Sequence, residues 1–262
     1  SNQDKMKFNQ MLDDQLQANL GNSMSALVED SESASCGPVV TDILSDPDGD
    51  ESHGTTVQVI ENFNRLKLRV LEDLEDYNIE PGFIPMNLVL FRDALSHLMR
   101  ILRVLRTPRG NSLLIGVGGS GRQSQTRLAA FICEMKVFGI EITKNYRSVE
   151  FREDLKKLFN LAGVENQQTV FLFNDTQIKL ESFLEDVNNM LSSGLVPGLF
   201  CDDELAPLRD SVVDEAKKKG LDQTPDLLWN LFVERVRSNL HIVVCMSPVG
   251  DDFTRRIRMF PG

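Results

Sequence analysis

The spacing of hydrophobic positions changes near residue 111. Before it, apolar side chains recur every three or four positions, which predicts helices over 57–77 and over Met86–Arg106. The second helix is expected to end at Thr107-Pro108, because proline cannot continue a helix. These two helices are therefore expected to lead into a differently built region.

From residue 111 onward, short apolar runs alternate with amphipathic segments. Strands are predicted at Ser112–Gly116, Gly139–Thr143, Thr169–Asn174 and Leu240–Ser247. Helices are predicted at Arg122–Lys136, Glu150–Ala162, Leu180–Ser192 and Thr224–Ser238, with a charged helical excursion over 201–222. This alternation is typical of a parallel sheet flanked by helices, so the predicted fold class is α/β.

The N-terminal part differs in composition from the rest. Residues 29–52 are rich in Ser, Gly, Pro and carboxylates, which indicates a helical or partly disordered N-terminal extension. A calcium loop starting at Asp46 is the alternative, but its glycine is fourth rather than sixth, so we interpret the stretch as an acidic turn. We expect three parts: a leader or insertion over 1–55, N-terminal helices over 56–110, and a nucleotide-binding domain over 111–262.

Composition and charge exclude several classes of protein. The chain has 41% hydrophobic and 26% charged residues, and no apolar run approaches the roughly 20 residues that span a bilayer. A formal net charge of −11 argues against a nucleic-acid groove, which needs a basic surface. We therefore expect neither a membrane nor a nucleic acid as partner.

A glycine-rich segment follows the first predicted strand and precedes a predicted helix. In this arrangement, phosphate can approach bare backbone N–H groups at the positive end of the helix dipole. A glycine-rich turn without a ligand is the alternative. The candidate phosphate-binding residues are Gly116, Val117, Gly118, Gly119, Ser120, Gly121, Arg122, Gln123 and Ser124.

This segment departs from the Walker A pattern G-x-x-x-x-G-K-[ST] at two positions. Arg122 occupies the lysine position, and its wide planar fork does not replace a compact ammonium between phosphates. Gln123 occupies the position of the hydroxyl that binds Mg²⁺, with Ser124 one place later. Nucleotide binding is expected to survive these changes better than hydrolysis.

A second candidate element ends the strand predicted at Thr169–Asn174. A Walker B strand ends in an aspartate that holds Mg²⁺ and a glutamate that polarises the attacking water. Here Asn174 takes the first place and Asp175, a candidate catalytic residue, takes the second. Gln123 and Asn174 are accordingly weak candidate ligands for Mg²⁺. The alternative is an Asn-Asp pair that caps a turn.

Two further features lie toward the end of the chain. Ser247 follows the last predicted strand, where a P-loop ATPase places a polar sensor near the γ-phosphate, although a serine before Pro248 also suits a turn cap. The basic run Arg255, Arg256 and Arg258 lies where an arginine can reach the nucleotide of a neighbouring module. A solvated cationic helix is the alternative, and we favour it.

Four long segments together resemble the fourth AAA+ module of axonemal dynein heavy chains. They are NLVLFRDALSHLMRILRVLR, LLIGVGGSGRQSQTRLAAF, VFLFNDTQIKLESFLEDVNNMLSSGLVPGLF and NLHIVVCMSPVGDDFTRRIRMFP. The resemblance covers about residues 60–262. It implies an AAA+ sheet of order 5-1-4-3-2, with the fifth strand and the helical lid missing from this chain, and it places Leu88 and Val89 near the adenine.

The resemblance also implies a function. In this family the first module is the main ATPase and later modules bind nucleotide and modulate it. We therefore expect ATP or ADP as ligand with slow or no hydrolysis, neighbouring AAA+ modules as partners, and microtubule contact only through the full motor in the cytoplasm, cytoskeleton and cilium axoneme. The alternatives are a structural ring segment with an empty loop, or an autonomous P-loop NTPase.

Overall fold

A computed structural model describes residues 62–249 without a gap, residues 58–60, and isolated positions before residue 44 and after residue 252. The chain divides into two compact units, one of residues 1–71 and 90–99 and the other of residues 72–89 and 100–262. Most of the acidic stretch over 29–52, including the calcium loop considered at Asp46, lies outside the described residues. The expected boundaries at residues 55 and 110 stay predictions.

In the first unit, two short strands pair antiparallel. Strand β1 (Val40–Thr41) lies beside β2 (Gln58–Val59). Helix α3 (Phe63–Ile79) begins in this unit, and the guanidinium of Arg92, the first residue of α4 (Arg92–Arg106), lies 4.6 Å from the ring centroid of Phe63.

Both N-terminal helices are shorter at their start than the sequence indicated. The helix expected over 57–77 begins at Phe63, because the side chain of Asn62 accepts hydrogen bonds from the backbone N–H groups of Asn64 (2.9 Å) and Arg65 (3.2 Å) and caps the helix. The helix expected from Met86 begins at Arg92. The amide side chain of Asn78 pairs with both backbone groups of Met86, which holds that residue outside a helix.

The second unit is built on a four-stranded parallel sheet in the order β3-β6-β5-β4. This is the order that the resemblance implied for strands one to four, and the α/β prediction is confirmed. The strands are β3 (Ser112–Ile115), β4 (Lys136–Phe138), β5 (Thr169–Asn174) and β6 (Leu240–Met246). Every residue of β5 and β6 is buried, which explains why apolar side chains dominate both strands, with His241 a buried polar residue inside β6.

One predicted strand was placed wrongly. Gly139–Thr143 has no regular structure, and the strand lies just before it, where Val137 pairs with Val170 and Phe138 with Phe171. The preceding helix, expected to reach Lys136, ends at Ile132 because Glu134 adopts a positive φ of 56°. The segment KVFGIEIT has apolar residues on both sides of Gly139, so its pattern alone does not select which half pairs.

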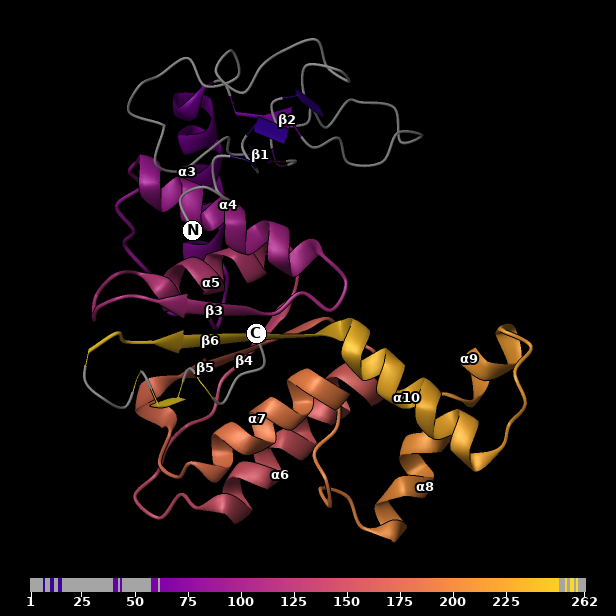
Figure 1. Ribbon diagram of the computed structural model, residues 1–262. Coiled ribbons are helices and arrows are strands. Elements are labelled where there is room, and N and C mark those ends of the chain that lie inside the picture. The colour runs from indigo at the N-terminus through magenta and orange to yellow at the C-terminus, as the bar shows by residue number, and fades with distance from the viewer. Residues whose placement is uncertain are drawn as a thin grey trace. The chain divides into compact units, whose positions relative to one another are not determined.

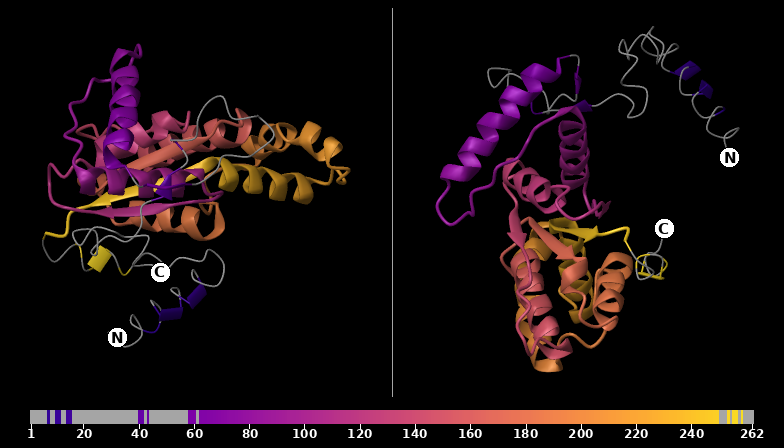
Figure 2. Two further views of the ribbon diagram at one scale, coloured as in Figure 1. Left: turned by 90° about the horizontal axis from the view of Figure 1, so that it is seen from above. Right: turned by 90° about the vertical axis from the view of Figure 1, so that its left-hand side faces the viewer.

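Helices cover both faces of this sheet (Figure 1). Helix α5 (Arg122–Ile132) lies on one face, and α6 (Ser148–Phe159) and α7 (Ser182–Ser193) lie on the other, as Figure 2 also shows. The core between the sheet and α6 and α7 is aromatic: the rings of Phe151 and Phe183 stack with centroids 4.2 Å apart.

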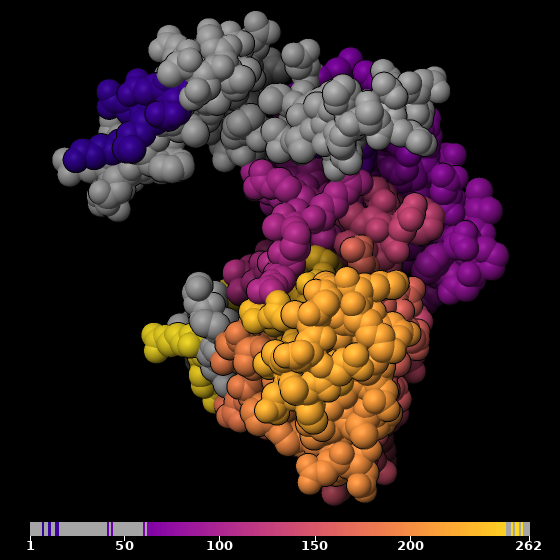
Figure 3. Space-filling model, turned by 90° about the vertical axis from the view of Figure 1, so that its right-hand side faces the viewer, coloured from indigo at the N-terminus to yellow at the C-terminus, as the bar shows by residue number. Residues whose placement is uncertain are grey.

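The expected excursion over 201–222 forms two helices, α8 (Asp202–Asp210) and α9 (Val213–Lys218). Together with α10 (Pro225–Asn239) they form much of the orange to amber surface in the lower part of Figure 3. The guanidinium of Arg235 holds this excursion against α10, because it donates hydrogen bonds to the Glu215 carboxylate and to the carbonyl oxygens of Gly163 and Ser211. In the described part of the chain, no helix is both long enough and apolar enough to cross a membrane.

Candidate functional site

The glycine-rich segment over 116–121 connects the end of β3 to the start of α5. Gly119 and Gly121 adopt positive φ angles of 79° and 76°, which L side chains rarely tolerate. A Cβ at Gly118 or Gly119 would meet no atom within 4 Å, so the backbone is open there. A Cβ at Gly116 would lie 2.7 Å from Ser120 Oγ, a contact that rotation of the serine side chain would relieve.

Helix α5 begins without a side-chain cap among the described residues. Its first intrahelical bond runs from Gln125 N–H to the Gly121 carbonyl (2.8 Å), which leaves the preceding N–H groups free of intrahelical partners. Gln123 is exposed and Ser124 is partly buried. Open loop amides at the positive end of an uncapped helix fit an anionic polyphosphate.

Arg122 does not extend into solvent beside the loop. Its guanidinium donates to the carbonyl oxygen of Met246, the last residue of β6, and to the Val117 carbonyl in the loop (3.3 Å). The Met246 carbonyl also accepts the Gly116 N–H (3.1 Å). The side chain at the Walker lysine position is thus bound to backbone oxygens.

Asn174 and Asp175 end β5 at the same edge of the sheet. Asn174 is 7% exposed, and its Oδ1 has no hydrogen-bond partner within the described residues. Asp175 Oδ2 accepts the backbone N–H of Ser247 at 2.8 Å. The structure therefore joins the two candidates Asp175 and Ser247 directly.

The sequence analysis did not identify Gln177, whose side-chain amide links two segments at this edge of the sheet. Its Oε1 accepts the Asn174 N–H (2.8 Å) and its Nε2 donates to the Ile140 carbonyl (2.7 Å). One amide therefore ties the end of β5 to the segment after β4. A glutamine three residues after Asn174 is the spacing of a capping box, so the signal was present in the sequence.

The donor set at this edge fits Mg²⁺ poorly. Proteins hold this ion through one or two carboxylates together with substrate phosphates. Gln123 and Asn174 offer neutral amide oxygens, and one oxygen of Asp175 already accepts from Ser247. Elsewhere in the described part of the chain, no three His, Cys, Asp or Glu side chains are grouped as around a metal ion.

Leu88, Val89 and the C-terminal arginines are the remaining candidates from the sequence. Leu88 borders the end of the loop, because its Cδ2 is 3.9 Å from a Cβ built at Gly121. Val89, expected near the adenine, is 78% exposed. Arg255 forms an ion pair with Glu181, the residue before α7. The favoured interpretation of Arg255, Arg256 and Arg258 as a solvated cationic helix stays a prediction, as does the alternative action on a neighbouring module's nucleotide.

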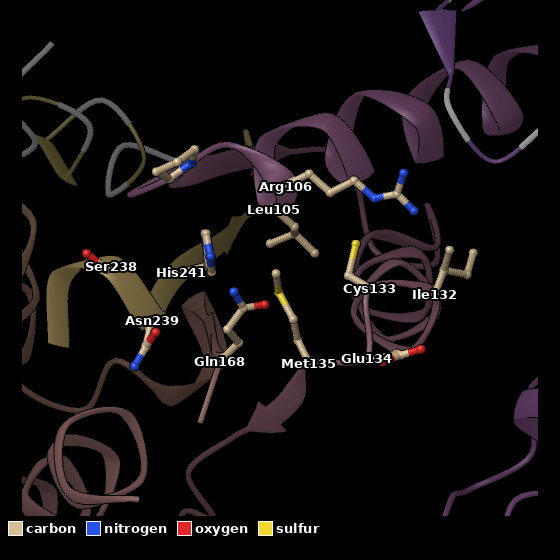
Figure 4. A pocket seen from close by; sticks show the side chains of 11 residues that line it. Leu105, Arg106, Ile132, Cys133, Glu134, Met135, Gln168, Ser238, Asn239 and His241 are labelled. Carbon is tan, nitrogen blue, oxygen red and sulfur yellow. The ribbon is translucent and has the colours of Figure 1, made fainter. Parts of the chain in front are cut away.

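A cavity of about 600 Å³ lies at the opposite edge of the sheet (Figure 4). Its lining includes Met135 and Gln168, which precede β4 and β5, and His241 near the start of β6. His241 Nδ1 bonds the Gly110 carbonyl oxygen at 2.7 Å, and burial lowers the pKa of its imidazole. Since the phosphate loop lies at the carboxyl ends of the strands, this cavity is not part of the candidate site.

Burial raises the pKa of the Cys245 thiol from about 9 to about 11, against a lowering by Arg122 and with a smaller rise from Asp175. Between pH 9 and pH 11 the thiol loses its proton in the unfolded chain and keeps it in the folded chain. The contribution of Cys245 to the free energy of unfolding is therefore fully present below pH 9 and is lost as the pH rises to 11. We expect a loss on the order of 2–3 kcal/mol. Urea unfolding at several pH values should show a larger loss of stability between pH 9 and 11 in the native chain than in Cys245→Ala, by about this amount; equal losses would contradict it.

Comparisons with known proteins agree with this geometry. Residues 86–262 match the model of the P-loop containing dynein motor region D4. The chain is 58% identical over 78% of its length to the dynein-1-beta heavy chain of the flagellar inner arm I1 complex of Chlamydomonas reinhardtii. It is 49% identical over 86% of its length to mouse dynein axonemal heavy chain 2, and 51% identical over 73% to human dynein axonemal heavy chain 6.

The chain spans only 4% to 5% of the length of these relatives. The residues that match the family model make up more than half of the chain. They include the open loop, the uncapped helix α5 and the four strands of the parallel sheet, whose order is the one that the resemblance implied. The chain therefore belongs to the dynein heavy chain family, and its residues 86–262 correspond to the P-loop-containing AAA+ motor region D4.

Proposed function

We propose that this module binds ATP or ADP at the loop over 116–121 and hydrolyses ATP slowly or not at all. The observation that carries the proposal is the open loop backbone, with positive φ at Gly119 and Gly121, directly before an uncapped helix. Weak hydrolysis is supported by three features: the commitment of Arg122 to backbone carbonyls, the neutral amide of Asn174, and the Asp175–Ser247 hydrogen bond. Leu88 and Val89 would border the adenine.

In the full protein, the module would regulate rather than drive an axonemal dynein motor. Its partners would be the neighbouring AAA+ modules of the same heavy chain, and it would contact microtubules only through the whole motor. The names of the relatives, which include axonemal heavy chains and a flagellar inner arm complex, support a place in the cytoskeleton of the cilium.

A structural ring segment with an empty loop is the second candidate. It is favoured by the contacts of Arg122, because a guanidinium that already donates to two carbonyl oxygens has fewer N–H groups left to bind a phosphate. The two candidates differ in whether nucleotide stabilises the fold. An autonomous NTPase has no comparable support.

The test is thermal unfolding with ATP, with ADP and without ligand. A ligand bound only by the folded state at 100 times its Kd should raise the Tm of a chain of this size by about 5–10 °C. Gly119→Leu should abolish this rise, because its side chain would fill the phosphate's approach.

Gly220→Leu is the matched control. Gly220 also has a positive φ, 65°, and a Cβ there would likewise meet nothing within 4 Å, but it lies after α9, away from the loop. Both variants should lose similar intrinsic stability, and only Gly119→Leu should lose the nucleotide response. The same response in both variants, or none in the native chain, would favour the structural segment.

A further inference from the structure

A single peptide group at the end of β6 is held from both sides by charged side chains. The carbonyl oxygen of Met246 and the N–H of Ser247 are the two ends of this group. Arg122 donates to the oxygen, and Asp175 accepts from the N–H at 2.8 Å. A cation and an anion are thus linked through one neutral peptide.

This arrangement joins three strands at the phosphate edge. Arg122 opens α5 directly after the loop that follows β3, Met246 ends β6, and Asp175 follows β5. The second Arg122 bond, to the Val117 carbonyl, adds the loop itself. Because β6 lies between β3 and β5, fixing this one peptide fixes the loop relative to both neighbouring strands.

The polarity of the contact is favourable at both ends. A guanidinium on the carbonyl and a carboxylate on the N–H polarise the peptide in the same sense, so each bond strengthens the other. Hydrogen bonds to charged groups are also stronger than neutral ones. Loss of either charged partner should therefore loosen the whole contact.

We propose that Arg122 is a positioning residue: together with Asp175 it braces the Met246–Ser247 peptide, and through this brace, not through a phosphate contact, it supports nucleotide binding. The support of nucleotide binding rests on the proposed function. The brace itself concerns the protein without nucleotide and is tested separately.

The first measurement is amide hydrogen exchange of Ser247 by NMR in the nucleotide-free 262-residue chain. Arg122→Met and Asp175→Ala should each speed exchange at Ser247 by about tenfold, the effect of losing one hydrogen bond to a charged group. Asp175→Asn keeps an acceptor oxygen but loses the charge, so it should speed Ser247 exchange less than Asp175→Ala does. Arg127→Met, which removes an exposed cation from the same helix, should leave it unchanged.

The second measurement is the Kd of fluorescent N-methylanthraniloyl-ADP with EDTA present, so that no metal contributes. The brace predicts about tenfold weaker binding for both Arg122→Met and Asp175→Ala, a smaller loss for Asp175→Asn, and unchanged binding for the control Arg127→Met. If Arg122 acts only by contacting phosphate, loss of the Ser247–Asp175 bond should not weaken binding, and removal of a negative charge beside a polyanion should make both Asp175 variants bind ADP more tightly.

Each outcome decides the proposal. Unchanged Ser247 exchange in Asp175→Ala and Arg122→Met, or tighter ADP binding by both Asp175 variants, would overturn it. If Arg122→Met fails to fold, the contrast between Asp175→Ala and Asp175→Asn carries the same decision. If the native chain does not bind ADP while the exchange rates change as expected, the proposed function fails and the brace stands.

Discussion

Gly110→Ala is expected to destabilise the module by about 3 kcal/mol or more, at the upper end of what overpacking costs. A Cβ at Gly110 would lie 1.9 Å from the Val104 carbonyl oxygen and 2.9 Å from that of Thr107. Both are backbone atoms, so no side-chain rotation relieves the clash. Moving residue 110 would also break its bonds to Thr107 (2.8 Å) and His241 (2.7 Å), directly before β3.

Urea unfolding measures this effect, with Gly139→Ala as the control. A Cβ at Gly139 would lie 3.9 Å from the Leu172 carbonyl oxygen, which is ordinary contact. The midpoint for Gly110→Ala should fall by about 1 M or more, given slopes of roughly 1–3 kcal/mol per molar urea. Equal midpoints for the two variants would show that the loop before β3 is free to shift.

Turnover of ATP by the chain is expected to stay below about 10⁻² s⁻¹, compared with roughly 1–100 s⁻¹ for kinases. Phosphoryl transfer depends on charge placed where the transition state develops it. Here Arg122 binds carbonyl oxygens, Asn174 is neutral, and one oxygen of Asp175 accepts from Ser247. Without a neighbouring module, an arginine supplied in trans is also missing.

Phosphate release under saturating Mg·ATP measures turnover, with Gly119→Leu as the control for contaminating ATPases. The native chain and this variant should release phosphate at closely similar rates. Turnover of several per second that disappears in Gly119→Leu would make the module an autonomous NTPase and would contradict a regulatory site.

The central strands of the sheet were predictable because strands that are buried on both faces consist mostly of apolar residues. Thr169–Asn174 was predicted with the bounds that β5 has, and Leu240–Met246 within one residue, since apolar side chains dominate both strands. The loop glycines were equally evident, because positive φ angles at Gly119 and Gly121 restrict the residue type.

Other features depend on tertiary contacts that the sequence pattern does not contain. The choice of Lys136–Phe138 over Gly139–Thr143 depends on register with β5, and the early end of α5 depends on the positive φ of Glu134. The contacts of Arg122 were equally hidden, because Met246 lies 124 residues away along the chain. Residue types at the site were predictable, whereas their hydrogen-bond partners were not.

The fate of bound ATP shows whether this module holds nucleotide without hydrolysing it. The chain, in excess over radiolabelled Mg·ATP, is passed through a desalting column after a delay, and the nucleotide eluting with the protein is identified by chromatography. We expect that label elutes with the protein and is still mostly ATP after one minute, since turnover below about 10⁻² s⁻¹ leaves more than half intact. Label that does not elute with the protein, or that is already ADP within seconds, would contradict it.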